Sequence, residues 1–159
     1  MVTVTLNNRL MGGLHYFHMA CRLLAAGHNR FEFMAEALLN FSKSLQSLFG
    51  ESRDDIRAEL KKLKVFTDDE IEAKFITAMF LRSEFDVAHA SLSTLNQDQL
   101  KTLHKYTNIV EGAFRKLFED LLEKVEKGEY TLPPDVKPVL KREKRKILEI
   151  IKRNIKPFE

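Results

Sequence analysis

Apolar residues recur at intervals of three and four along most of the chain, which is the spacing of amphipathic α-helices. The clearest stripe lies in residues 30–49 and consists of Phe31, Met34, Leu38, Phe41, Leu45 and Leu48. A longer, heptad-like stripe occupies residues 96–127 and ends before Gly128. Residues 2–5 alternate as a strand would, but this run is too short to found a sheet. The pattern predicts an all-α protein.

Further helices follow from the same spacing. Residues 10–26 form a predicted helix that Gly27 ends, and the pattern leaves open whether residues 10–49 are one kinked helix or two. Residues 53–63 read as a short surface helix, and residues 138–154 as a basic terminal helix. We therefore expect an up-and-down bundle of five or six helices.

Capping residues define several of the predicted starts. Ser52 precedes the short surface helix, and its hydroxyl can accept from a free backbone N–H. Thr67 and Asn96 are each followed three residues later by a side chain that can reach back, Glu70 and Gln99 respectively. These two pairs have the spacing of a capping box, which fixes the first turn of a helix.

The helix predicted for residues 67–95 is apolar around most of its girth, which is typical of a central helix. One side carries Ile71, Phe75, Ala78, Phe85 and Leu92, whereas Ile76, Phe80, Leu81 and Val87 fall on other faces. Arg82, Asp86 and His89 are set into the first side. At about 100° per residue, Arg82 and His89 lie within about 20° of each other and about 10 Å apart along the axis. Polar groups on an apolar face carry a desolvation cost, so this face requires a partner.

The order Leu81-Arg82, six residues, His89 and then Ala90, late in a long bundle helix, resembles the signature of the HEPN superfamily, the higher eukaryotes and prokaryotes nucleotide-binding domains. The family pattern is an arginine, four to six residues, and a histidine. Ser83 follows the arginine where the family most often has Asn, Asp or His. The resemblance implies a HEPN-like fold and a homodimer.

The same resemblance implies a metal-independent endoribonuclease with a site shared across the dimer. Arg82 and His89 are then the catalytic residues, Asp86 and Ser83 have supporting roles, and no cofactor is expected. Imidazole titrates near neutral pH and therefore suits proton transfer from a ribose hydroxyl. The resemblance also implies a toxin or defence effector, with RNA as substrate and an antitoxin such as a minimal nucleotidyltransferase as partner.

Other readings of the same residues remain open. Arg82 can pair with Asp86 one turn on, and His89 can be a core histidine bonded to a carbonyl. The domain would then be a non-catalytic HEPN-like helical module that binds a nucleotide or a partner protein. A carboxylate-bridged metal site is not expected, because the chain has no Glu-x-x-His, and His15 and His18 have no acidic residue placed to complete a site.

Charge changes the picture at the carboxyl end. The net charge of the 159 residues is +3, but residues 137–156 carry nine basic and two acidic residues, or +7, which leaves −4 for the rest. The residues placed to contact a nucleic-acid backbone without sequence preference are Lys141, Arg142, Lys144, Arg145 and Lys146. We therefore divide the chain into a HEPN-like bundle, residues 1–134, and a basic terminal helix, residues 135–159, that packs on the bundle or extends from it.

The single cysteine, Cys21, excludes an internal disulfide and lies on the apolar stripe of the first helix, where we expect it to be buried and inert. One cysteine fits a reducing compartment. No apolar run approaches the length of a membrane span. We therefore expect a cytoplasmic protein with no membrane partner.

Overall fold

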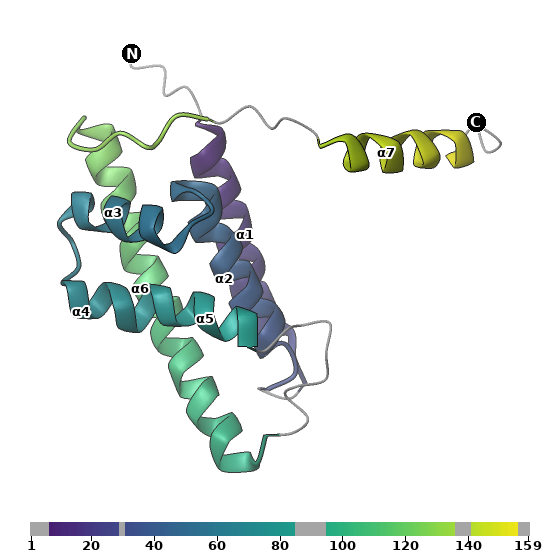
Figure 1. Cartoon of the computed structure of the whole chain (residues 1–159). Coiled ribbons are helices and arrows are strands. Elements are labelled where there is room, and N and C mark those ends of the chain that lie inside the picture. The colour runs from purple at the N-terminus through teal and green to yellow at the C-terminus, as the bar shows by residue number, and fades with distance from the viewer. Residues whose placement is uncertain (1–6, 29–30, 85–94, 136–140, 156–159) are drawn as a thin grey trace.

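The computed structural model describes residues 7–28, 31–84, 95–135 and 141–155. The regular elements in these ranges are all helices (Figure 1). In chain order they are α1 (Asn8–Ala26), α2 (Met34–Phe49), α3 (Arg53–Leu63), α4 (Asp68–Glu70), the π-helical segment η1 (Ile71–Ile76), α5 (Thr77–Glu84), α6 (Gln97–Glu126) and α7 (Arg142–Ile155). The all-α fold class predicted from the sequence is confirmed.

The helices α1 and α2 form an antiparallel pair along the long axis of the bundle. α2 also contacts α3, α5 and α6, and α6 contacts α1 and η1. Figure 1 shows α3 and the continuous run α4–η1–α5 crossing the long α6. Residues 10–49 thus form two helices, and α2 begins at Met34 instead of residue 30 because residues 31–33 make a turn. The bundle therefore consists of α1, α2 and α6 along its long axis, with α3 and the run α4–η1–α5 crossing over them.

A cluster of phenylalanine rings joins four of these elements. Phe114 of α6 lies 4.8 Å from Phe41 of α2, 5.4 Å from Phe75 of η1 and 6.1 Å from Phe17 of α1, measured between ring centroids. Phe41, Phe75 and Phe114 have no exposed surface. The predicted stripes of residues 30–49 and 96–127 therefore meet at these rings, and the ring contacts fix α6 against the other helices.

The predicted caps are confirmed. Ser52 Oγ accepts from the backbone N–H three residues on at 3.0 Å. Both predicted capping boxes close: Thr67 exchanges hydrogen bonds with Glu70 at 3.0 and 3.2 Å, and Asn96 with Gln99 at 3.0 and 2.9 Å. These starts were visible in the sequence because a capping box is local.

The segment after α6 packs on the bundle. Tyr130 and Leu132 are buried, and Tyr130 Oη donates to Glu59 Oε2 at 2.7 Å. Arg9 of α1 donates to the carbonyl of Pro134 at 3.1 and 3.2 Å and to that of Ser47 at 3.3 Å. Pro133 and Pro134 exclude a helix here, but the chain remains attached to the bundle through residue 135.

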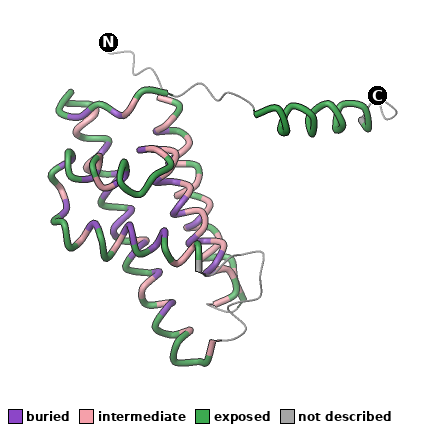
Figure 2. The backbone as a smooth tube through the Cα atoms, in the orientation of Figure 1, coloured by how far each residue is buried: buried purple, intermediate pink, exposed green. Residues whose placement is uncertain are grey.

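The terminal helix α7 lies apart from the bundle (Figure 1). It begins at Arg142, whereas the sequence predicted a start at residue 138, and residues 136–140 lie outside the described ranges. Every described side chain of α7 is exposed (Figure 2). The predicted basic terminal helix is thus present, and within the described chain it extends from the bundle.

Gly13 permits the close approach of α1 to α2. A Cβ added at Gly13 would lie 2.6 Å from Cγ and 2.7 Å from Cδ2 of Leu48, whose side chain is fully buried. The same approach lets Ser44 Oγ donate to the carbonyl of Gly13 at 2.8 Å. At the neighbouring Gly12 an added Cβ would meet Ser47 at 3.4 Å, an ordinary contact.

These contacts predict opposite effects for two adjacent substitutions. Gly13→Ala should lower the free energy of unfolding by about 1–3 kcal/mol, because the methyl group overpacks the α1–α2 contact. Gly12→Ala should raise it by up to about 1 kcal/mol, because alanine favours the helix and nothing obstructs it. Urea denaturation of both variants measures the difference. Equal effects of the two substitutions would contradict the close approach.

Candidate functional site

The central helix contains a π-helical segment that the sequence pattern did not predict. The central helix runs without a break through α4, η1 and α5. Within η1, the π-helical segment, the backbone hydrogen bonds span five residues. At its end the backbone N–H of Thr77 donates to the carbonyl of Glu72. Thr77 Oγ1 donates to the same carbonyl at 2.8 Å. Such wide turns are rare and occur frequently at functional sites, so this helix is a candidate location for one.

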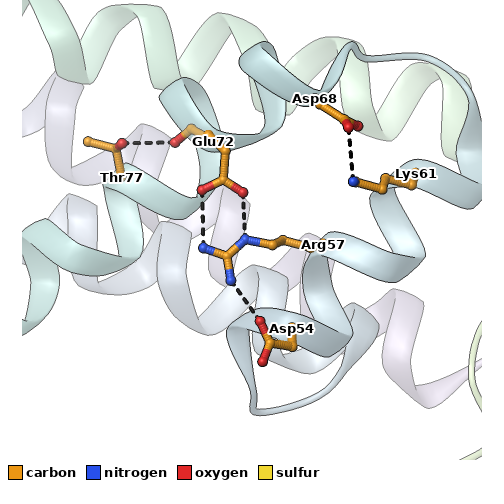
Figure 3. A network of polar contacts seen from close by, with 6 residues as sticks. All are labelled: Asp54, Arg57, Lys61, Asp68, Glu72 and Thr77. Carbon is orange, nitrogen blue, oxygen red and sulfur yellow. Dashed lines mark hydrogen bonds and ion pairs between the residues drawn. The ribbon is translucent and has the colours of Figure 1, made fainter.

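Side chains from α3 and α6 hold the π-helical segment in place. Arg57 of α3 donates to both carboxylate oxygens of Glu72, at 2.5 and 3.1 Å, and also to Asp54 (Figure 3). This bidentate contact lowers the pKa of Glu72. From α6, Tyr106 Oη donates to the carbonyl of Ala73 at 2.8 Å. The wide turns are thus bonded to two neighbouring helices.

The helix buries a broader face than its α-helical pattern predicts. Ile71, Phe75 and Ala78 are buried as expected, but Ile76, expected on another face, is buried too. The reason is that this run packs against α2, α3 and α6 together. Phe80 is 45% exposed, and the guanidinium carbon of Arg53 lies over its ring, 4.0 Å from the ring centroid of Phe80.

Arg82 lies where the buried face of α5 ends. Its side chain is half-buried, one turn beyond the buried Ala78 and Met79. No carboxylate among the described residues pairs with it. Ser83 is exposed, and its hydroxyl donates to the carbonyl of Met79 at 3.3 Å. The predicted position of Arg82 at an apolar face therefore holds, while Ser83 bonds its own helix.

Asp86 and His89, together with Phe85, Val87 and Leu92, lie outside the described residues. The site that Arg82 would share with His89 and Asp86 therefore stays a prediction. The basic residues 141, 142 and 144–146 lie on or just before α7, all of them exposed and away from α5.

A cleft between α5 and the start of α6 has Leu81, the residue before Arg82, in its lining. Its volume is about 640 Å³. Its lining consists of Thr77, Leu81, Leu95, Asn96, Asp98, Gln99, Thr102, Leu103 and Tyr106. Leu81 precedes Arg82 in the chain, so the cleft and the arginine share one end of α5. Sequence reasoning missed Tyr106, because it lies off the heptad-like stripe of its helix and its partner is a backbone carbonyl.

A second hollow lies between the start of α1 and the end of α2, and its charge does not suit nucleic acid. Its volume is about 750 Å³, and Arg9, Glu51, Asp55, Glu59 and Asp135 are among its lining residues. Arg9 is committed to the carbonyls of Ser47 and Pro134. The carboxylates that remain would repel a phosphate backbone.

The remaining candidates from the sequence have ordinary roles. His15 and His18 are exposed on α1. Within the described ranges no three His, Cys, Asp or Glu side chains gather as metal ligands would. Cys21 is half-buried, whereas we expected full burial, and this burial together with the nearby Glu111 raises the pKa of its thiol to about 11.

No family model, curated protein or solved structure gives a significant match to this chain. The class that the described structure defines is therefore an all-α bundle with an exposed basic helix. Among the described helices, none combines the length and apolar character that crossing a membrane requires.

Tyr106→Phe should lower the free energy of unfolding by about 1 kcal/mol, because the carbonyl of Ala73 loses its donor. Burial raises the pKa of Tyr106 to about 12 from 10.0, so the folded state favours the neutral phenol. Its contribution is complete below about pH 10 and is lost as pH rises toward about 12. Urea denaturation at neutral pH and near pH 11 should show a larger loss for the unchanged protein than for the variant.

The matched control for this measurement is Tyr16→Phe. Tyr16 offers its ring to Lys43 at 5.6 Å and donates no hydrogen bond to another described residue. Its substitution should leave the free energy of unfolding at neutral pH nearly unchanged. A Tyr106→Phe variant as stable as the control would remove the hydroxyl from any role in supporting η1.

Cys21 should react slowly with iodoacetamide. A thiol whose pKa is raised from 9.0 to about 11 has about 100-fold less thiolate near pH 8, and the thiolate is the nucleophile. Mass spectrometry of the alkylated protein measures the rate, with the urea-unfolded chain as internal control. Equal rates in the folded and unfolded states would contradict the protected environment.

Proposed function

We propose that the protein is a metal-independent endoribonuclease of the HEPN type, with a composite site that takes Arg82 and His89 from each of two copies. The observation that carries the proposal is the position of Arg82, half-buried beyond Met79 and without a carboxylate partner among the described residues. A guanidinium that no described carboxylate engages has donors for a phosphate, whose geometry its planar fork matches.

In the proposed reaction a ribose 2′-hydroxyl attacks the adjacent phosphorus and the bond to the 5′-oxygen breaks. The products are a 2′,3′-cyclic phosphate and a 5′-hydroxyl. Histidine accepts the proton from the attacking hydroxyl and returns one to the leaving oxygen. Arg82 stabilises the negative charge that develops on the phosphoryl oxygens. Asp86 and Ser83 have supporting roles in this proposal.

The homodimer is part of the same proposal. A two-fold axis repeats every residue of the interface, so two arginines and two histidines enter one cleft. Two positive guanidinium groups near the histidines favour the neutral, basic form of imidazole. The resemblance in the sequence further suggests a toxin or defence effector controlled by an antitoxin such as a minimal nucleotidyltransferase.

The cleft between α5 and α6 supports a second candidate, a non-catalytic HEPN-like module that binds a nucleotide or a partner protein. Its volume of about 640 Å³ lies in the range of small-molecule sites. Apolar walls at Leu81 and Leu103 suit a flat base, and Thr77 and Asp98 supply polar groups at the same cleft. This candidate requires no chemistry from Arg82.

Incubation of total RNA with the purified protein in EDTA tests the first candidate. We expect cleavage that survives the chelator and leaves 2′,3′-cyclic phosphate ends. Arg82→Ala and His89→Ala should each lower the rate at least about 100-fold, because each removes a group that acts on the reacting phosphate or its proton. Gel electrophoresis of end-labelled RNA measures the rates.

Arg22→Ala and His15→Ala are the matched controls, since both residues are exposed on α1. They should leave the rate unchanged. Cleavage that tolerates both site substitutions would remove Arg82 and His89 from catalysis. If the unchanged protein does not cleave RNA and His89→Ala dissociates the dimer in size-exclusion chromatography, the binding module is the better reading.

A further inference from the structure

The described part of α7 exposes an apolar patch that no other described element covers. Ile147, Leu148, Ile150 and Ile151 are 56%, 44%, 55% and 45% exposed. Figure 2 shows the helix exposed along its length. Four large apolar side chains within five positions are not a scatter of surface residues, and such patches mark interaction sites.

Five of the six basic residues of α7 lie on the side opposite the patch, whereas Glu143 and Lys144, at the start of the helix, fall within the arc of the patch. At about 100° per residue, the four apolar residues span an arc of about 160°. The opposite arc, about 120° wide, carries Arg142, Arg145, Lys146, Lys152 and Arg153, with Glu149 among them. Across α7 six basic residues stand against two acidic ones, a net charge of +4. The helix is therefore amphipathic and cationic.

Neither nucleic acid nor a second copy of α7 accounts for both sides. A phosphate backbone would neutralise the basic side but leave the isoleucines in water. Two copies paired through the apolar side would bring basic edges together, because Lys152 and Arg145 flank one edge of the arc and Lys146 and Arg153 flank the other. Like charges at such flanking positions oppose pairing.

We propose that α7 is an interfacial helix that lies on a lipid bilayer with anionic headgroups. The apolar arc would enter the boundary between headgroups and acyl chains, and the basic arc would face the anionic headgroups. An arc this wide exceeds the single i, i+3, i+4, i+7 stripe that a protein groove reads. The sequence predicted no membrane partner because no apolar run could span a bilayer, but a helix that lies on the surface needs no such run.

Sedimentation of the full chain with vesicles tests this surface. Vesicles of equal amounts of phosphatidylcholine and phosphatidylglycerol should bind the protein, and phosphatidylcholine alone should bind it far less. The double variant Ile147→Asn/Ile151→Asn should weaken binding at least about 100-fold, because two apolar side chains no longer leave water. Arg145→Gln/Lys152→Gln should weaken it about 25-fold, since each charge contributes about fivefold near an anionic surface.

The matched control is Ile109→Asn/Leu122→Asn, which removes two exposed apolar side chains from α6. It should leave vesicle binding unchanged, and circular dichroism should show that each variant keeps its helices. Failure to bind the anionic vesicles would overturn the proposal. Binding of RNA in place of vesicles, unaffected by Ile147→Asn/Ile151→Asn, would also overturn it. A dimer that the same double substitution dissociates would overturn it as well. RNA cleavage tests the proposed nuclease separately, because its proposed catalytic residues, Arg82 and His89, lie outside α7.

Discussion

The contact of Phe114 with three other phenylalanine rings holds the bundle together. It is the point at which α1, α2, η1 and α6 meet, and three of the four rings are completely buried. Aromatic pairs contribute about 0.5–1.5 kcal/mol each beyond the area they bury. Because Phe75 belongs to η1, this cluster also fixes the π-helical segment, and with it the direction in which α5 leaves the core.

The π-helical segment is stabilised by hydrogen bonds from neighbouring residues, because its own backbone hydrogen bonds span five residues instead of four. Thr77 donates to the backbone carbonyl of Glu72, Arg57 to the carboxylate of Glu72, and Tyr106 to the carbonyl of Ala73. The bond from Thr77 is local, but those from α3 and α6 are tertiary contacts, so the segment does not depend on local preference alone. They place the end of α5, and therefore Arg82, relative to the start of α6 and the cleft between them.

The sequence predicted what depends on near neighbours and missed what depends on distant ones. The capping boxes at Thr67 and Asn96 could be read from four residues each, and the helical stripes from their period. The π-helical turns could not, because Tyr106 lies 33 residues from Ala73. The packing of residues 130–135 was missed for the same reason: prolines exclude a helix but say nothing of a bond to Arg9. Of the candidate site, the half-buried position of Arg82 follows from periodicity, whereas the adjoining cleft follows only from how α5 and α6 pack.

The partial burial of Arg82 suits the phosphate-binding role that we propose for it. A fully buried guanidinium must be paired within its own subunit, because an isolated buried charge is too costly. A fully exposed one stays hydrated and mobile, so it would bind a phosphate with little geometric preference. At the edge of the buried face the aliphatic stem can pack against the bundle while the charged end reaches water. Such an arginine costs the bundle little and needs no internal partner, and donors that no described carboxylate engages are what a ligand phosphate would require.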